Sequence, residues 1–495
     1  MSKKSTSLVV LLCLILAGTT AGQDSTYKFT VQTLGGYTTP GVVPFWLRSN
    51  QFGSIPLDGA LLSMIGAARK DYDLSGDKLF DWGASLEGRT NLGQGSNLTL
   101  IEGYGKVRLG IFELRAGRSK KITGLCDSTL SSGSWAISGT NLGIPEVELS
   151  VREFWTLPWT GELFALKGNF SHGWMGYVPM NRWFEGGDTV QVITYLHQKS
   201  LYGRFGKPSW KFKLYGGFNH QVVWCDENVY YTRDFDLSLI DTYFYVLTGK
   251  RYNNGFIEST RLGNHIGSID VGLELDFKRI TLLFYRQNFY DGGALSALAN
   301  IQDGLNGFGL TNLQVLDNAL NWKKINFEFL YTKNQAGEPW SPEYGSFYEN
   351  YYNHGEYFEG WSYKDNGLGS PFVTPRTQTR NELPNNPIEY FSNNRLWAIH
   401  LGSEGGIFSF DYLIKISWSK NFGTYMTTDD EQSTGLINPG VVGLFGENEQ
   451  LSAYLELNRE LANGFRLGFL GAIDHGTLLY NSLGLFLKAS YSFEL

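Results

Sequence analysis

Aromatic and polar side chains are interspersed along residues 335–393 in a way that suits the binding of sugars. Flat rings can stack on the CH faces of a sugar, and nearby amides and carboxylates can bond its hydroxyl groups. Six residues are our candidates for a carbohydrate site, four for stacking and two for hydroxyl recognition: Trp340, Trp361, Tyr363 and Tyr425, then Asp365 and Asn366. The alternative is that the rings pack this long segment into a small core of its own, or into the mouth of the structure that carries it.

Other patterns that could carry chemistry are weaker. The chain has seven histidines: His172, His197, His220, His265, His354, His400 and His475. None of them forms a zinc-type pair with a convincing acidic partner. The sequence 171–173 is not a nucleophile elbow, because Asn169 stands where the first glycine should be. Phosphate loops and dinucleotide fingerprints are absent from the sequence as well. We therefore expect no catalytic residue, no metal and no cofactor.

Residues 231–250 carry a helical spacing within a long connection. Phe235, Leu239, Tyr243 and Leu247 recur every four residues, which predicts a short amphipathic helix. Such a helix could act as a lid or plug over an interior, or it could simply pack its own loop.

The N-terminus has the features of a secretory signal. Lys3 and Lys4 precede an apolar run, 8–16, that is too short to span a bilayer, and Thr20-Ala21-Gly22 suits cleavage. We expect residues 1–22 to be the signal peptide and 23–495 to form one domain. Two cysteines remain after cleavage, Cys126 and Cys225. An envelope location permits a disulfide between them, although two free thiols would also fit.

The elements that must position these residues are strands. Residues 483–493 show the pattern best, because Leu483, Leu485 and Leu487 would share one face, with Gly484, Phe486 and Lys488 on the other. The same alternation predicts eighteen strands, near 28–36, 59–72, 79–91, 96–108, 111–118, 146–157, 162–172, 194–206, 209–224, 259–276, 279–290, 303–316, 324–334, 394–403, 406–420, 447–459, 463–473 and 479–494.

The connections between these strands alternate in length. One set is short and includes 109–110, 277–278, 404–405 and 460–462. The other set is longer and comprises 37–58, 119–145, 173–193, 225–258, 291–302, 335–393 and 421–446, with 92–95 and 474–478 as short exceptions. Short periplasmic turns and long extracellular loops are typical of a transmembrane antiparallel β-barrel of the outer membrane. A soluble sandwich or propeller has no reason to separate its loops in this way.

The composition agrees with a barrel. Aromatic residues make up 15% of the chain and charged residues only 18%, and there are 60 glycines. Barrels use aromatic residues in interfacial girdles and glycine where strands bend. The formal net charge of −7 argues against binding to nucleic acid.

Several short motifs resemble, in the same order, those of the Wzi family of outer-membrane capsule-assembly proteins, particularly the forms found in the Bacteroidetes. The matching segments are 44–53 (PFWLRSNQFG), 116–118, 130–133, 138–141, 171–174, 196–203 (LHQKSLYG), 264–270 (NHIGSID), 303–305, 352–355 and 421–425. Enterobacterial members of the family carry a helical segment near the N-terminus that helps to close the lumen. The corresponding stretch here is 37–58, in which Pro40, Pro44 and Pro56 limit the length of any helix.

The resemblance implies an eighteen-stranded barrel that acts as a lectin rather than an enzyme. Its expected partners are a capsular or exopolysaccharide, outer-membrane lipid and the polysaccharide-export machinery. The first rival is a porin or substrate-specific diffusion channel, since a wide barrel can leave an aqueous space. The second is an outer-membrane enzyme, because catalytic triads are assembled in space and are not always visible in a sequence. The sequence leaves open which sugar is bound and whether the lumen is open or plugged.

Overall fold

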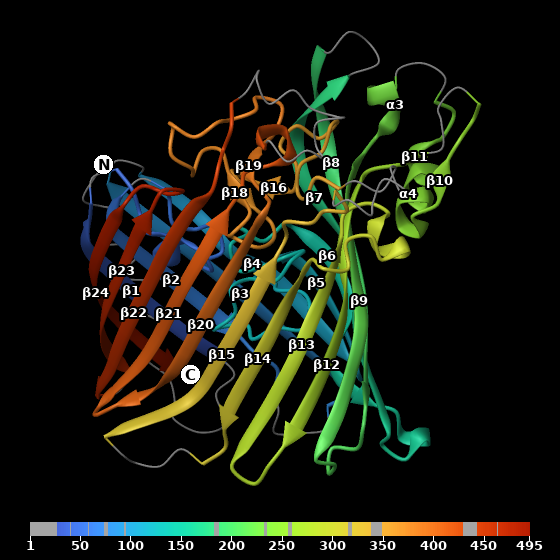
Figure 1. The fold of residues 1–495 in the computed structure, drawn as a ribbon. Coiled ribbons are helices and arrows are strands. Elements are labelled where there is room, and N and C mark those ends of the chain that lie inside the picture. Colours follow the sequence, from blue (N-terminus) through green and yellow to red (C-terminus); the bar gives the residue numbers. More distant parts are fainter. Residues whose placement is uncertain are drawn as a thin grey trace, which may run out of the picture.

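The chain folds into a closed antiparallel β-barrel of eighteen strands (Figure 1). The computed structural model describes residues 27–39, 41–57, 59–73, 78–93, 96–182, 188–231, 235–255, 260–314, 319–337, 349–428, 443–462 and 464–495. Each strand pairs with the next along the chain, and the first strand, β1, also pairs with the last, β24, so the sheet closes on itself. Closure leaves no open strand edge, as a hydrocarbon environment requires.

All eighteen predicted strands are confirmed. They are β1 (Tyr27–Thr38), β2 (Ala60–Lys70), β3 (Phe80–Gly93), β4 (Asn97–Leu109), β5 (Phe112–Arg118), β6 (Glu146–Thr156), β7 (Phe164–Arg182), β8 (Asp188–Phe205), β9 (Phe212–Cys225), β12 (Asn264–Asp276), β13 (Ile280–Tyr290), β14 (Gly304–Asn312), β15 (Leu320–Tyr331), β20 (Leu396–Ile407), β21 (Phe410–Asn421), β22 (Asn448–Ala462), β23 (Phe465–Gly476) and β24 (Ser482–Glu494).

The loops contain short elements of their own. They are the helices α2 (Phe45–Arg48), α3 (Glu227–Tyr231) and α4 (Leu239–Thr248), the 3-10 turns Pro158–Thr160, Ala294–Ala297 and Tyr425–Thr427, and the two-stranded pairs β10 (Arg251–Tyr252) with β11 (Thr260–Arg261), β16 (Ser362–Tyr363) with β17 (Asn366–Gly367), and β18 (Thr374–Pro375) with β19 (Phe391–Asn393). No helix among the described residues is both long and apolar enough to cross a membrane.

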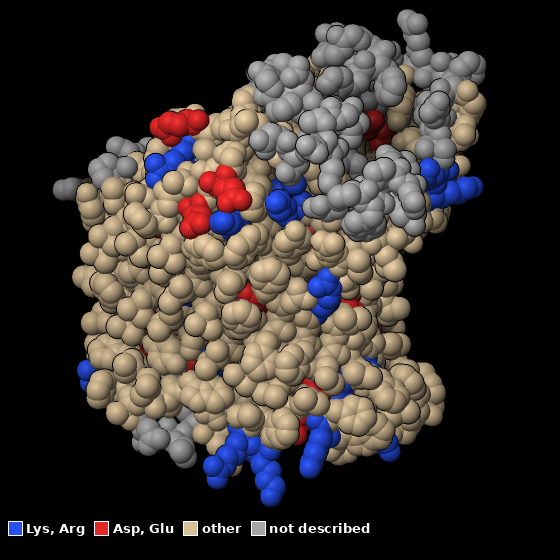
Figure 2. All heavy atoms as spheres, in the orientation of Figure 1, with Lys and Arg blue, Asp and Glu red and all other residues tan. Residues whose placement is uncertain are grey.

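The alternation predicted from the sequence separates an outer face from an inner one. Leu483, Leu485 and Leu487 of β24 are exposed on the outside, whereas Gly484 and Phe486 are buried on the inside. Figure 2 shows that the outer wall on this side carries almost no charged residues, and that basic side chains gather at its lower edge. An apolar wall around a closed barrel is what lipid requires, and the chain is an outer-membrane β-barrel.

The short connections lie at the same end of the barrel as the two ends of the described chain. The backbone N–H of Leu495 donates to the carbonyl of Tyr27 at 3.0 Å, and Tyr27 pairs with Lys70, the last residue of β2. This is the periplasmic end. One predicted turn was misplaced: β20 continues through 404–405 to Ile407, so the chain reverses at Phe408 instead. Its φ of +52° supplies the left-handed backbone that this tight turn needs.

The opposite, extracellular end is uneven in height. β7 and β8 are the longest strands, 19 and 18 residues, and their upper halves rise above the rest of the rim (Figure 1). The largest cluster of buried hydrophobic residues lies inside the barrel, where the long loops fold inward and meet the inner wall. A smaller cluster, which includes Val222 and Val246, lies between α4 and the outer wall. The interior of the barrel is therefore the main core of the protein.

Candidate functional site

Aromatic side chains from two inward-folded loops fill the extracellular part of the lumen. Trp135 of loop 119–145 stacks on Phe289 of the inner wall with ring centroids 4.0 Å apart. Tyr351 and Tyr352 of loop 332–395 pack against the same indole at 4.8 and 4.6 Å. All four residues are buried. We call the inward-folded parts of loops 39–59, 119–145 and 332–395 the plug.

Hydrogen bonds from side chains to backbone carbonyls hold the two larger loops of the plug together. The indole N–H of Trp361 donates to the carbonyl of Ala136 at 2.7 Å, and the hydroxyl of Tyr352 donates to the carbonyl of Trp135. Gly369 makes this contact tight, because a Cβ on it would lie 1.9 Å from the carbonyl oxygen of Trp135. Only glycine allows the two backbones to approach so closely.

The third part of the plug is the segment that precedes β2. As the prolines predicted, its helix is only four residues long, beginning after Pro44. Its Phe45 and Trp46 are buried inside the barrel, where Phe45 packs on Phe372 at 5.2 Å and Trp46 on His400 at 5.0 Å. The three loops thus meet through aromatic contacts across the lumen.

A serine–histidine pair lies within this packing. The Nδ1 of His400 is 2.7 Å from the hydroxyl of Ser417, and its Nε2 is 2.7 Å from the carbonyl of Leu130. Because a carbonyl only accepts, Nε2 carries the proton and Nδ1 accepts from the serine. The orienting carboxylate of a catalytic triad is replaced by a backbone carbonyl, and both side chains are buried. The pair therefore positions loop 119–145 against the wall.

Buried carboxyl groups tie the extracellular loops to one another. Glu349 accepts hydrogen bonds from the backbone N–H groups of Gly292 and Ala294, both at 3.0 Å, and from the amide of Asn300 at 3.1 Å. Asp303 accepts from the backbone N–H of Gln335 and from the hydroxyl of Tyr351, both at 2.7 Å. These bonds join loop 291–303 to both described stretches of loop 332–395, at Gln335 in the first and at Glu349 and Tyr351 in the second.

The two carboxyl groups hold their protons unusually tightly. Burial raises the pKa of Glu349 to about 7, and the nearby charge of Asp303 adds to the effect, although the backbone N–H donors oppose it. Burial likewise raises the pKa of Asp303 to about 7. The attachment of these loops therefore depends on pH within the neutral range.

Two polar cavities adjoin the plug inside the barrel. The larger, about 270 Å³, is lined by charged residues that include Glu87, Arg89 and Lys488. The smaller, about 170 Å³, includes Arg115 and Arg152, and Lys120 lines both. Lys120 is paired with Glu87 at 2.7 Å, so two of the charges that face the larger cavity compensate each other.

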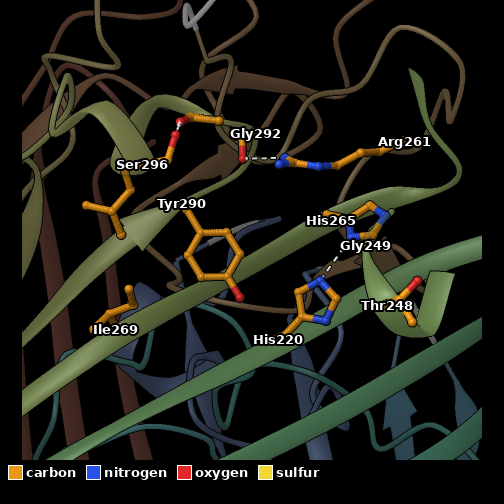
Figure 3. A pocket seen from close by; sticks show the side chains of 11 residues that line it. His220, Thr248, Gly249, Arg261, His265, Ile269, Tyr290, Gly292 and Ser296 are labelled. Atoms are coloured by element: carbon orange, nitrogen blue, oxygen red, sulfur yellow. Dashed lines mark hydrogen bonds between the residues drawn. The ribbon is translucent and has the colours of Figure 1, made fainter. Parts of the chain in front are cut away.

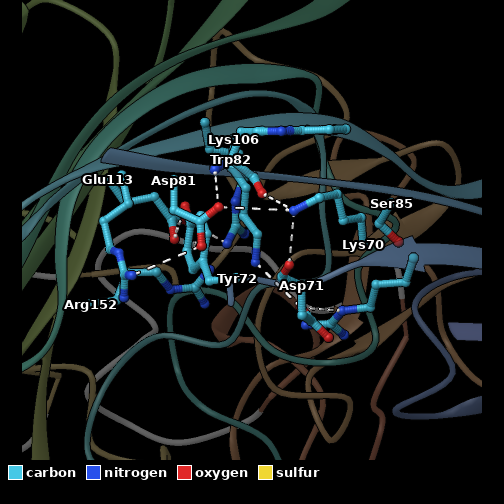
Figure 4. A network of polar contacts seen from close by, with 12 residues as sticks. Lys70, Asp71, Tyr72, Asp81, Trp82, Ser85, Lys106, Glu113 and Arg152 are labelled. Atoms are coloured by element: carbon cyan, nitrogen blue, oxygen red, sulfur yellow. Dashed lines mark hydrogen bonds and ion pairs between the residues drawn. The ribbon is translucent and has the colours of Figure 1, made fainter. Parts of the chain in front are cut away.

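A network of ion pairs continues toward the periplasmic end (Figure 4). Lys106 lies 3.5 Å from Asp71, and Arg152 lies 3.3 Å from Glu113, which also accepts from the hydroxyl of Tyr72 at 3.0 Å. The lower part of the lumen is thus lined by polar and charged side chains, whereas the upper part is filled by the aromatic plug.

The structure corrects the expected role of three candidate residues. Trp361, Tyr363 and Tyr425 are buried, with 0%, 6% and 2% of their surface exposed, so none offers a ring face to a sugar. Trp361 holds the plug together, and the hydroxyl of Tyr425 donates to the carbonyl of Asn334 at 2.7 Å. The rings pack the barrel mouth, which was the alternative interpretation. Trp340 lies outside the described residues.

The two polar candidates lie at a tight turn between β16 and β17. Lys364 and Asp365 both have positive φ, +52° and +63°, and both are exposed, while Asn366 is partly exposed. The turn places Asp365 near Tyr390, whose pKa rises to about 12 through burial and through the negative charge of Asp365. Asp365 and Asn366 remain available for recognition at the surface.

Around this turn the structure assembles a group that the sequence analysis recognised only in part. We call it the loop patch, and it comprises Phe358, Glu359, Lys364, Asp365, Arg376 and Tyr390. The guanidinium of Arg376 lies 5.7 Å from the ring centroid of Phe358, and the backbone N–H of Phe358 donates to Pro179 of the raised β7 at 3.3 Å. The patch lies on the extracellular side, and its members come together only through the fold of loop 332–395.

The two cysteines are not bonded to each other. Cys225 is a buried free thiol that donates to the sulfur of Met180 at 3.5 Å, and Cys126 is a second free thiol in loop 119–145. The disulfide considered from the sequence is therefore wrong for this structure. The expected helix in 231–250 is present as α4, but Thr242 and Val246 form its buried side, and it does not cover the lumen.

Comparisons with protein-family models and with curated proteins gave no match. Solved structures similar to this chain include Acinetobacter baumannii OccAB4, with 9% identity, coverage of 96% of this chain and 99% of that one, and a TM-score of 0.45. Pseudomonas aeruginosa OccD3 (OpdP) has 11% identity, coverage of 95% and 91%, and a TM-score of 0.42. A loop-deletion mutant of OmpT, an outer membrane protein of Vibrio cholerae, has 7% identity, coverage of 95% and 99%, and a TM-score of 0.34.

Proposed function

We propose that this chain is a closed outer-membrane barrel that binds a capsular or exopolysaccharide at its extracellular surface, as the resemblance to the Wzi family implies. The observation that best supports the proposal is the plug, in which Trp135, Phe289, Tyr352 and Trp361 pack across the lumen. Close-packed side chains leave no room for solute diffusion. The loops then serve to build a fixed outer surface.

The loop patch has the chemistry that such a surface needs. Phe358 supplies a ring, Asp365 and its neighbour Asn366, beside the patch, supply hydroxyl-binding oxygens, and Arg376 supplies a cation for acidic sugar units. The loop patch is fixed to the plug and is not part of a free loop end. Less conformational entropy is therefore lost when it binds a ligand. A polysaccharide that is bound at this face while it is being exported would bring the barrel close to the polysaccharide-export machinery. The proposal therefore includes that machinery as a partner.

A second candidate function is a substrate-specific channel that opens when the plug moves. The two polar cavities beside the plug and the charged wall below it favour this alternative, because they resemble a wet path that is interrupted only at the plug. Ion pairs such as Lys120 with Glu87 would then be able to rearrange around a charged solute.

Binding of purified barrel in detergent micelles to the polysaccharide of its own cells would test the proposal. The double variant Asp365→Ala, Arg376→Ala should bind at least about tenfold more weakly, because two charge-assisted contacts are lost. The matched control is Asp411→Ala, which removes an exposed carboxylate, paired with Lys323 at 2.9 Å, at the opposite end of the barrel. Absence of binding by the unmodified protein, with solute flux through it, would favour the channel instead.

A further inference from the structure

A polar band interrupts the apolar outer wall near its extracellular border. In β9 the outward residues Phe212, Leu214 and Phe218 are exposed to lipid, and the same face continues upward through His220. The register across β8, β9 and β12 has no shift, so residues paired there share a face. His220 therefore lies on the outside of the barrel.

Two neighbouring rows of paired residues make up this band. The upper row runs across β7, β8, β9 and β12 as His172, His197, Val222 and His265, and the lower row runs across β8, β9, β12 and β13 as Lys199, His220, Gly267 and Tyr290. Four of the seven histidines of the chain thus lie together on a surface where apolar residues are expected.

Helix α4 folds down over part of this band from outside, beside β9 (Figure 1). The ring of Tyr243 packs edge-on against His172 and His197, at 5.5 and 5.6 Å. Lys199 donates from its ammonium to the carbonyl of Leu247. The outer side of the helix remains apolar and exposed, since Ile240 and Phe244 keep 68% and 56% of their surface. A helix of this kind suits the boundary between lipid headgroups and acyl chains.

Beside α4 the band opens into a cavity of about 350 Å³ (Figure 3). Its polar lining comes from His220, His265, Arg261 and Tyr290, together with Thr248 and Ser296, and none of its lining residues is acidic. Ile269, exposed on the outer wall, continues the lining toward the apolar belt. The cavity is thus basic at the top and apolar at the bottom.

The hydrogen bonds of the cavity leave defined positions for a ligand. The Nε2 of His265 lies 3.0 Å from the carbonyl of Leu262 and must donate to it, so its Nδ1 accepts from the Nε2 of His220 at 2.9 Å. The remaining Nδ1 of His220 is buried and has no partner among the described residues. The exposed guanidinium of Arg261 gives one of its five N–H donors to the carbonyl of Gly292, at 2.9 Å.

We propose that this cavity binds the phosphorylated sugar headgroup of a glycolipid in the outer leaflet. Arg261 takes the phosphate, and the Nδ1 of His220 accepts from a sugar hydroxyl. The acyl chains run down the outer wall past Ile269, beside the apolar side of α4. The lipid, rather than a soluble phosphate, is the occupant because the cavity opens on the wall that faces the bilayer. No group of three or more His, Cys, Asp or Glu side chains in the described parts of the chain is placed to hold a metal ion.

Native mass spectrometry of the full-length barrel, released from micelles that contain lipid A, tests this site. Lipid A is a phosphorylated glucosamine disaccharide with acyl chains. We expect Arg261→Gln and His220→Phe each to reduce the fraction of barrel that retains lipid A at least about tenfold, since each removes a hydrogen bond to the headgroup. Arg466→Gln is the matched control, because that arginine is exposed at the periplasmic end and paired with Glu460 at 2.9 Å. It should retain lipid A like the unmodified protein.

Three further results bear on the proposal. Lipid A from which the phosphates have been removed should be retained at least about tenfold less by the unmodified barrel. Equal retention of the two lipids, or of lipid A by Arg261→Gln and the control, would overturn the phosphate assignment. Full displacement of lipid A by millimolar inorganic phosphate would show that the cavity serves a soluble anion and would overturn the lipid assignment. The substituted residues lie outside the plug. Heat-modifiable migration in gel electrophoresis that is unchanged from the unmodified protein shows that each variant barrel has folded.

Discussion

At the scale of single residues, the titration of Glu349 makes the loops sensitive to pH. Its pKa is raised from 4.5 to about 7 in the folded protein, so the folded loops bind its proton more tightly than the opened loops do. Their attachment is therefore strongest below about pH 4.5 and weakens as the pH rises to about 7. We expect amides in 291–303 and 349–353 to exchange faster at about pH 8 than at about pH 5, after correction for intrinsic rates.

Two variants identify the group responsible for this pH dependence. Glu349→Gln keeps the acceptor for Gly292 and Ala294 but cannot ionise, so its exchange should depend on pH clearly less than that of the unmodified protein, with the remaining dependence due to Asp303. Asp365→Asn removes an exposed carboxyl from the same loop and should leave the pH dependence intact. If Glu349→Gln still responded to pH like the unmodified protein, the effect would have to come from another group, and the role given to Glu349 would be wrong.

Residue type alone did not predict how deeply a side chain lies. Trp361 and Asp365 are four positions apart in one loop, yet the first is the anchor of the plug and the second is exposed at a turn. The sequence showed that the loop was rich in rings, and rings serve equally well for stacking on sugars and for packing a core. Only the approach of loop 119–145, which supplies Trp135 and the carbonyl of Ala136, decides between the two.

At the scale of elements, α4 depends on its caps because few of its residues are buried. The hydroxyl of Ser238 accepts from the backbone N–H of Asp241 at 3.2 Å, and Gly249 ends the helix with a φ of +65°. Ser238→Ala should destabilise the helix by about 1 kcal/mol. Proteolysis within 239–248 should then be about fivefold faster while the barrel stays intact. Ser238→Asp restores an N-cap and should restore resistance to proteolysis. Equal cleavage of the unmodified protein and both variants would show that α4 is held by its contacts with the wall alone.

The strands were predictable because one physical rule governs them all. Every second residue of each strand must face lipid, so apolar and polar residues alternate along the sequence. The misplaced turn at 404–405 shows where this rule fails. Gly405 and Gly406 resemble a turn sequence but lie within the β20–β21 ladder, and the chain reverses at Phe408. The position of α4 was not predictable, since nothing local tells whether a helix covers the lumen or the outer wall.

At the scale of the whole molecule, closure of the barrel and closure of the lumen are separate events. The strand ladder closes through the pairing of β1 with β24, whereas the lumen is filled by loops that are far apart along the chain. Barrel closure follows from the lipid environment and could be predicted. Lumen closure depends on which loops meet inside, as Phe45 meets Phe372, and such contacts leave no periodic signal.

This separation predicts that the largest loop of the plug can be removed without opening the barrel wall. The side-chain amide of Gln335 lies 3.0 Å from the carbonyl of Asn394, so a short Gly-Ser linker can replace 337–393. The ladder between β15 and β20 would remain. In planar bilayers the unmodified protein should be nearly silent, whereas the variant should show discrete conductance steps, since eighteen strands enclose a wide lumen.

As a control, replacement of 226–262 should stay silent, because α4 packs on the outer wall and β9 still pairs with β12 from Val223 and Asn264 onward. Discrete conductance steps from the unmodified protein, equal to those of the variant, would mean that the plug does not close the lumen, and the channel alternative would then replace the surface-binding proposal.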